Sequence, residues 1–190
     1  MALADYINNK PVIETDRLLI RPMTVLDVPA LRKWMQDRSI YTYWGKGPGK
    51  AEMYPELLFE KTERPTKSFH LGIANKQNNE VIGDLWVYLI ENDRMAQVAI
   101  RLSKEEHGKG YGTEALSAMI RFCFENTELQ RLWTQVDVRN TASWKMLEKC
   151  SYKREGLIRQ GKMVNTWCDY YNYGILASDI KQEVFNENDS

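Results

Sequence analysis

The sequence predicts an α/β fold: one mixed, mostly antiparallel sheet of about six to seven strands, with helices on both faces and one central βαβ crossover. Three observations lead to this prediction. Between residues 68 and 102, apolar and polar residues alternate with a period of two in three runs separated by turn residues. From Gly110 the period changes to that of a helix, and the run 131–138 alternates again. A strand, a long helix and a strand in this order form a parallel crossover.

The N-terminal third contains a strand, two helices and an aromatic loop. RLLIRPM (17–23) alternates and predicts a strand, and Asp27 precedes a short helix over 28–35 as its N-cap. YTYWGKGPGK (41–50) combines aromatic residues with glycines, so this loop is either a binding surface or a loop whose rings pack inward. The spacing of apolar residues predicts a further helix over 51–61.

The C-terminal third follows the strand 131–138. Asn140 begins a short helix, TASWKMLEKC, with Trp144, Leu147 and Cys150 facing inward. Two strand-like runs, YKREGLIRQ and NTWCDYYNYGIL, follow and are separated by a turn at Gly161. No repeat or low-complexity linker interrupts the chain, so we expect one domain over 1–178 and a polar tail over 179–190.

Composition excludes several classes of protein. The 190 residues contain 26 Lys and Arg and 26 Asp and Glu, so no net charge favours nucleic acid or an anionic membrane as a partner. No apolar run approaches a membrane span and the opening MALADYINNKPVIE has no apolar signal core, so we expect a cytoplasmic protein. Three widely spaced cysteines and two histidines match no zinc signature, and Cys123 and Cys150 lie on apolar helical stripes as packing residues.

The segment HGKGYGT carries the chemistry, because it lies where a strand leads into the long helix. Glycines at 108, 110 and 112 leave room for several backbone N–H groups to converge on an anion, and the helix N-terminus adds partial positive charge. Lys109 and Thr113 could add a charge and a hydroxyl to the same anion. The turn therefore predicts a phosphate site, and the alternative is a glycine-rich connector without a ligand.

Two other nucleotide folds fit this segment poorly. The dinucleotide fingerprint needs a third glycine where Thr113 stands, and it needs a second crossover that the sequence lacks, although Asp137 lies near the end of the next strand. The phosphate loop of nucleoside triphosphatases needs Gly-Lys-Ser/Thr, which does not follow the turn. Coenzyme A is therefore the nucleotide that we consider next.

The runs AQVAIRLS, EEHGKGYGTEAL and DVRNTASWKMLEKCSYKREG together resemble the GNAT superfamily of acetyl-CoA-dependent N-acetyltransferases. The branch is that of the ribosomal-protein N-terminal alanine acetyltransferases and the spermidine acetyltransferases. The resemblance covers roughly 80–177 well and the opening RLLIRPMTVLDVPAL, and it is loose over 38–66. It places the family's pyrophosphate loop, Q/R-x-x-G-x-G/A, on the residues His107, Gly108, Lys109, Gly110, Tyr111 and Gly112, extended by Thr113. His107 departs from the family's Gln or Arg.

The resemblance also implies roles for neighbouring residues. Backbone groups of Ile100 and Leu102 would meet the pantetheine arm of acetyl-CoA, and a backbone N–H would polarise the thioester carbonyl. Asn140 and Ser143 match the family's N-x-x-S, which lies near the pantetheine, the acetyl group and the thiol. Asn140 is equally an ideal helix N-cap, so a pure capping role stays open.

Proton transfer is the ambiguous part of the site. Many relatives have a general-acid Tyr where this chain has Leu147, and a Glu where it has Gln97, so Ser143 or water is the better proton donor. Asp84 and Asp169 could join a water chain, or they could be ion-paired or surface residues. These departures keep a non-catalytic acetyl-CoA-binding module as the alternative. The resemblance permits a protein N-terminus, a polyamine or an amino sugar as acceptor and leaves the oligomeric state open, a homodimer included.

Overall fold

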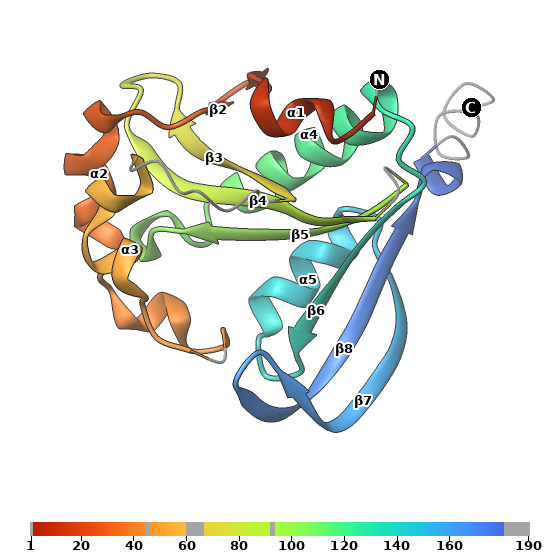
Figure 1. The fold of residues 1–190 in the computed structure, drawn as a ribbon. Helices are drawn as coiled ribbons and strands as arrows, with labels where there is room; N and C mark the ends of the chain where they lie inside the picture. Colours follow the sequence, from red (N-terminus) through yellow and green to blue (C-terminus); the bar gives the residue numbers. More distant parts are fainter. Residues whose placement is uncertain (1, 45, 60–66, 92–93, 181–190) are drawn as a thin grey trace.

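The computed structural model describes residues 2–44, 46–59, 67–91 and 94–180. Its centre is one sheet in the order β1-β2-β3-β4-β5-β6-β8-β7 (Figure 1). The strands are β1 (Ile13–Glu14), β2 (Leu18–Arg21), β3 (Ser68–Asn75), β4 (Val81–Glu91), β5 (Met95–Leu102), β6 (Arg131–Asp137), β7 (Lys153–Met163) and β8 (Thr166–Leu176). The two ends of the sheet point in different directions, because β6, β8 and β7 turn away from β5.

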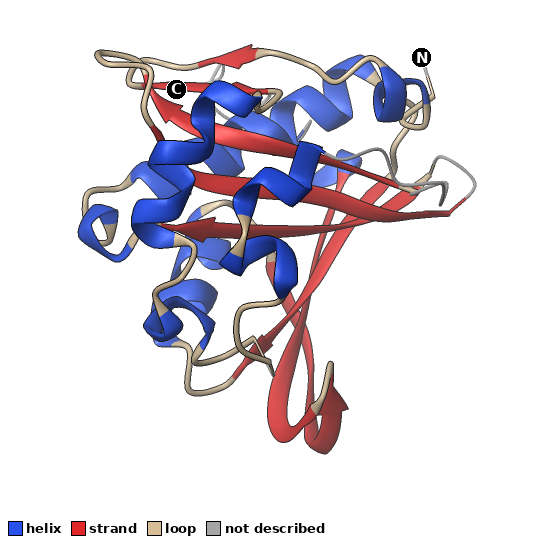
Figure 2. Cartoon of the chain, turned by 60° about the vertical axis from the view of Figure 1, so that its left-hand side comes forward, coloured by secondary structure: helices blue, strands red, loops and turns tan. Residues whose placement is uncertain are grey.

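Helices cover both faces of this sheet (Figure 2). The α-helices are α1 (Asp5–Asn8), α2 (Val28–Trp34), α3 (Lys50–Met53), α4 (Tyr111–Asn126) and α5 (Thr141–Lys149). Four short 3₁₀ helices are η1 (Val25–Asp27), η2 (Arg38–Tyr41), η3 (Pro55–Phe59) and η4 (Lys104–Glu106). The apolar side of α4 packs in the main core with Leu85 and Val98, whereas Leu31 and Trp34 of α2 pack on the opposite face against Ala74.

The predicted meander and crossover are confirmed. β3, β4 and β5 pair antiparallel in sequence order, as their period of two predicts. β5 and β6 then pair in parallel, with α4 as the connection between them. The mixed, mostly antiparallel sheet thus agrees with the prediction, but it has eight strands instead of six to seven. The extra strand is β1, which is too short to show any alternation in the sequence.

The helix predicted over 51–61 is wrong in its extent. α3 ends at Met53, and the 3₁₀ helix η3 begins at Pro55. Proline has no backbone N–H to donate within a helix, and it disfavours helical geometry at the residue before it. Tyr54 accordingly leaves the helical conformation, with φ −133° and ψ 78°.

The turn predicted at Gly161 is also displaced. β7 continues to Met163, and the reversal lies at Val164, whose φ is +55°. Gly161 is a strand residue opposite Cys168, and a Cβ at this position would lie 2.6 Å from Cε1 of Tyr170. The glycine is therefore required for close packing on a neighbouring ring and not for a change of direction.

Two local expectations at the ends of elements need adjustment. The side chain of Asp27 does not cap α2, because the 3₁₀ turn η1 comes first: its Oδ2 accepts from the Thr24 N–H at 2.8 Å, and the carboxylate pairs with Arg21. Of the predicted polar tail, 179–190, only residues 179 and 180 belong to the described part of the chain. Asp179, at its start, accepts from Lys153 Nζ at 2.5 Å.

Candidate functional site

The two central strands separate at the candidate site. β5 and β6 pair only at Met95 with Arg131, Ala96 with Leu132 and Gln97 with Trp133. Beyond these pairs β5 remains bonded to β4 and β6 to β8, but within the described residues the segments 98–102 and 134–137 are not paired with each other. Figure 1 shows the resulting V between β5 and β6. Each strand therefore presents one row of backbone N–H and C=O groups to this gap.

The glycine turn follows β5 after the short helix η4. Gly108 and Gly110 have φ values of +76° and +84°, in the left-handed region that glycine adopts without steric cost. Gly110 is the N-cap of α4, a helix of 16 residues. The N–H groups of the first helical turn have no acceptor within the helix, and they carry its partial positive charge. This geometry is suited to a phosphate, as the sequence predicts.

The third glycine of the turn has a packing role. Gly112 is buried, and a Cβ at this position would lie 2.9 Å from Sδ of Met146 and 3.4 Å from Cδ1 of Leu102. Met146 belongs to α5 and Leu102 to β5. The absence of a side chain at Gly112 thus lets the start of α4 approach both elements that border the gap.

The side chains of the turn bond mainly to the protein itself. Nε2 of His107 lies 3.2 Å from the carbonyl oxygen of Leu102, and Nζ of Lys109 donates to Oε2 of Glu106 at 3.0 Å. The Lys109 side chain is half exposed. Since Lys109 already has a carboxylate partner, backbone N–H groups are the main donors that the turn offers to an anion.

Arg17 fixes this turn, and the sequence analysis missed it. Its guanidinium lies over the Tyr111 ring, 4.5 Å from the ring centre, and Nη1 donates to the carbonyl oxygen of Lys109 at 3.0 Å. Nε donates to Oε2 of Glu114 at 2.6 Å, and Thr15 Oγ1 donates to Oε1 at the same distance. Burial alone would raise the pKa of Glu114, but the hydrogen bonds from Thr15 and Arg17 outweigh it and lower the pKa. The sequence spacing gives no signal for this contact, which joins residues 97 positions apart.

Asn140 caps α5, as predicted. Its Oδ1 accepts from the N–H of Ser143 at 3.3 Å. Ser143 is half-buried in the first turn of α5, and Leu147 is only 3% exposed within the main core. Gln97 is buried at the last position of β5 that pairs with β6. Gln97 and Leu147, the positions at which this chain lacks the family's Glu and Tyr, are therefore closed to solvent.

The acidic residue Asp84 is ion-paired, which decides between the two interpretations of its role. Arg101 donates to Asp84 through Nε at 3.0 Å and through Nη2 at 2.6 Å, and Nε2 of His70 lies 3.0 Å from Oδ2. The Asp84 side chain is fully buried. Asp169, in contrast, accepts from the backbone N–H of Gln160 on the terminal hairpin. The structure thus brings neither carboxylate to the gap as a free base.

Four aromatic rings surround the Arg101 guanidinium, at 4.5–5.7 Å from the ring centres: Trp34, Tyr41, Trp44 and Trp86. The Tyr41 hydroxyl accepts from Nη1 of Arg101 at 2.9 Å and donates to the carbonyl oxygen of Met35 at 2.7 Å. Burial raises the pKa of Tyr41 to about 12. Tyr41 and Trp44 therefore follow the packing interpretation of the aromatic loop.

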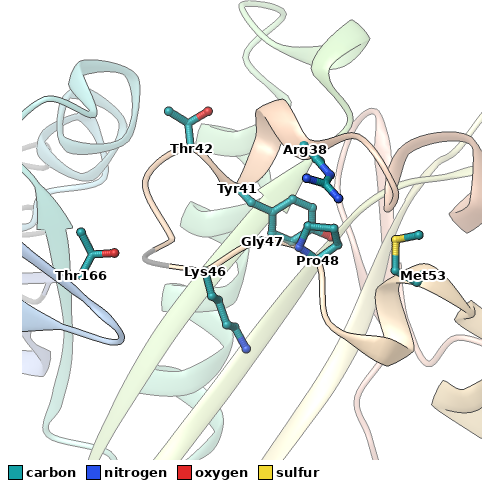
Figure 3. A pocket seen from close by; sticks show the side chains of 8 residues that line it. All are labelled: Arg38, Tyr41, Thr42, Lys46, Gly47, Pro48, Met53 and Thr166. Carbon is teal, nitrogen blue, oxygen red and sulfur yellow. The ribbon is translucent and has the colours of Figure 1, made fainter.

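A cavity of about 560 Å³ lies beside this cluster (Figure 3). It is lined by Arg38, Tyr41, Thr42, Lys46, Gly47, Pro48, Met53 and Thr166. Residues 38–42 and 46–53 reach the cavity beside the Arg101 cluster, through the bond between Tyr41 and Arg101, and Thr166 reaches it from the first residue of β8. The cavity thus lies between these two segments and the start of β8, and no described residue of β5 or β6 lines it.

The sequence model of the acetyltransferase (GNAT) domain matches residues 17–153. The chain belongs to the GNAT acetyltransferase family. A probable N-acetyltransferase of Bacillus subtilis, YjcK, is 31% identical and covers 75% of this chain and 77% of its own. Family membership confirms the resemblance and identifies the protein as an N-acetyltransferase.

Solved structures of GNAT enzymes share this fold. The spermidine N-acetyltransferase of Vibrio cholerae, in complex with CoA and spermine, has a TM-score of 0.74 at 21% identity and covers 87% of this chain and 98% of its own. The ribosomal-protein-S5-alanine acetyltransferase of Vibrio fischeri has a TM-score of 0.75 at 20% identity, with 90% and 98% covered. These two enzymes represent the branch that the sequence resembles.

The Cys123 thiol lies in the main core. Burial raises the pKa of the Cys123 thiol to about 12, so this cysteine stays protonated as a packing residue. The described residues contain no group of three or more His, Cys, Asp or Glu side chains able to hold a metal ion. Their helices include none long and apolar enough to cross a membrane.

Proposed function

We propose that this GNAT enzyme transfers an acetyl group from acetyl-CoA to a primary amine within a ternary complex. The observation that carries the proposal is that two features follow each other along the chain: a strand edge that can bind amide groups, and a glycine turn that can bind an anion. The edge of β5 that faces β6 has no strand partner among the described residues beyond Gln97, and the chain then passes through the short helix η4 into the glycine turn at the N-terminus of α4. A ligand with a linear amide arm and a pyrophosphate at one end matches both features in this order.

The chain's own groups then take the following roles. Backbone N–H groups of the turn, including those of Gly108, Gly110 and Gly112, bind the pyrophosphate, with Lys109 as an exposed supplementary charge. Peptide groups of Ile100 and Leu102 bind the amide arm and hold the thioester in the gap. One N–H of β5 polarises the thioester carbonyl and stabilises the negative charge that develops on its oxygen. His107, Tyr111 and Thr113 complete the border of the turn.

The transfer forms a C–N bond and breaks a C–S bond. The neutral amine attacks the carbonyl carbon, and the CoA thiolate leaves with a proton that Ser143 or a water molecule donates. Gln97 has no basic group to accept the proton of the amine, so water accepts it. Positioning of the two reactants supplies much of the rate acceleration in such a site. Asn140 keeps Ser143 in place through the helix cap.

The solved GNAT neighbour with CoA and spermine supports an amine acceptor and a CoA donor for the shared fold. The acceptor of that enzyme is not assigned to this chain, because the two chains are only 21% identical. We therefore propose a primary amine as the general acceptor class.

Release of the CoA thiol and mass spectrometry of the acetylated amine test this proposal with a panel of peptides, polyamines and amino sugars. We expect turnover that requires both substrates and no acetylated enzyme when the amine is omitted. Ser143→Ala should lower kcat about 100-fold and leave the Kd for acetyl-CoA unchanged, as expected for loss of a general acid. Ser117→Ala, on α4, is the matched control. Binding of acetyl-CoA without turnover of any amine would contradict the proposal and favour a non-catalytic binding module.

A further inference from the structure

The cavity between the Arg101 cluster and the start of β8 has a cationic lining. Arg38 and Lys46 are its two charged lining residues, and no described carboxylate lines it. In Figure 3 the Tyr41 and Pro48 rings lie between these two side chains. The lining thus carries two positive charges, although the whole chain has no net charge.

Two carboxylates next to lining residues, those of Glu52 and Asp37, already accept hydrogen bonds from other groups. Glu52 accepts from Arg101 at 3.3 Å and from the N–H of Gly49 at 3.0 Å. Asp37 accepts from the N–H of Ser39 at 2.8 Å. Within the part of the chain that the structure describes, Arg38 and Lys46 have no ion-pair partner, whereas the cationic residues of α2, Arg32 and Lys33, pair with Glu56 and Glu80.

We infer that the acceptor amine carries an anionic group, a carboxylate or a phosphate, which Arg38 and Lys46 bind. This inference rests on the proposed acetyl transfer, and it narrows the acceptor class. Both cations can donate to an anionic oxygen, and the guanidinium can do so in a bidentate manner. The opposite case, a polyamine, would bring two or more positive charges into a cavity that offers two positive charges and no described carboxylate.

The Arg101 guanidinium does not share this role. It is 5% exposed, and Asp84, Tyr41 and Glu52 accept its hydrogen bonds. Arg101 therefore holds the Tyr41 wall in place, and the anion must be bound by the two residues whose charges are free. Thr42 and Thr166 are the hydroxyl-bearing residues of the lining besides Tyr41, whose hydroxyl is bonded to Arg101 and Met35, and they suit the neutral part of an acceptor.

Matched acceptor pairs test the inference. An amino acid and its amide differ by one carboxylate, and glucosamine 6-phosphate and glucosamine differ by one phosphate; spermidine is the polycationic probe. We expect kcat/KM to be at least about tenfold higher for the charged member of one pair, and that pair identifies the anion. The double variant Arg38→Gln, Lys46→Gln should remove the preference, and Arg38→Glu, Lys46→Glu should shift it toward spermidine. The double variant Arg32→Gln, Lys33→Gln, with the same change of charge on α2, should keep it.

Three results would overturn the inference. The first is an equal or higher kcat/KM for the neutral members or for spermidine with the unmodified enzyme. The second is a preference that survives Arg38→Gln, Lys46→Gln with an unchanged thermal midpoint. In both cases acetyl transfer itself persists, so the proposed function stands. The third is intact acetyl-CoA binding without transfer to any amine, which removes the proposed function together with this inference.

Discussion

Arg17 donates from Nε to Oε2 of Glu114 at 2.6 Å, and this contact joins the residue before β2 to the first turn of α4. The same guanidinium holds the carbonyl oxygen of Lys109 within the glycine turn. The conformation of the glycine turn is therefore supported from outside, by a residue that is remote in the sequence.

Arg17→Ala should weaken acetyl-CoA binding, because the turn loses two hydrogen bonds and the stacking on Tyr111. The pair is partly exposed, so we expect a loss of about 1 kcal/mol, close to a fivefold increase in Kd by isothermal titration. Arg32→Ala removes the exposed ion pair with Glu56 and serves as the control. An Arg17→Ala protein with unchanged Kd would show that acetyl-CoA binding does not need the contacts of Arg17 with the turn.

Substitutions within the turn should rank by their position. Gly112→Asp should abolish coenzyme binding, because a Cβ there meets Met146 and the carboxylate repels phosphate. Gly110→Asp should do the same through its left-handed φ and its charge. Lys109→Ala removes one exposed, already paired charge and should raise Kd less than Arg17→Ala does. A more severe effect of Lys109→Ala in titrations would argue against backbone capture of the pyrophosphate.

Asn140→Ala should lower the thermal midpoint even without ligand. The lost cap bond to the Ser143 N–H corresponds to about 1 kcal/mol of unfolding free energy. Asn140→Asp keeps the capping acceptor and should restore most of the stability. If it also restores the Kd for acetyl-CoA, the residue acts through the cap alone; if stability returns without affinity, the amide contacts the coenzyme.

The buried Asp84 should make the protein sensitive to acid. Burial raises the pKa of Asp84, but the charge and hydrogen bonds of Arg101 and the hydrogen bond with His70 outweigh this effect, so the pKa is lowered. A carboxyl with a lowered folded-state pKa stabilises the fold above its unfolded value, near 4, and this contribution is lost as the pH falls toward the folded-state pKa. Asp84→Asn should flatten the acid limb of the unfolding free energy.

The same substitution should cost about 3–5 kcal/mol at neutral pH, because Arg101 is left buried without its main counter-charge. Denaturant unfolding between pH 3 and 7 measures both effects. Asp16→Asn, which removes an exposed carboxylate, is the control variant. An unchanged acid limb in Asp84→Asn would exclude this carboxyl as a source of the acid sensitivity.

The sequence predicts the parts of the site that rest on local chemistry. The period of two in β3 to β5, the glycines that need left-handed φ and the Asn140 cap all depend on residues a few positions apart. The Arg17 contact and the Arg101 cluster depend on strand neighbours and on a loop that folds across the sheet. Asp84 and Arg101 are opposite each other across β4 and β5, a register that the alternation of the two strands suggests only after their pairing is known.

The limits of the helices and turns show the same division. The end of α3 just before Pro55 can be predicted from the sequence, because proline disfavours a helical conformation at the residue before it. Gly161 is different, because a glycine in a strand and a glycine in a turn have the same local sequence signature. Its real role depends on the Tyr170 ring, nine residues further along and across the hairpin.

The separation of β5 from β6 creates two sheet edges inside the molecule. Exposed edges normally invite another polypeptide to add as a strand, which leads to aggregation. Here each edge faces the other across the gap, and β4 and β8 pair with the outer sides of β5 and β6. A peptide strand in this gap would place side chains above and below the sheet at alternate residues. A linear ligand without such side chains needs less room. These internal edges are therefore less open to the addition of a foreign strand than the outermost strands of the sheet.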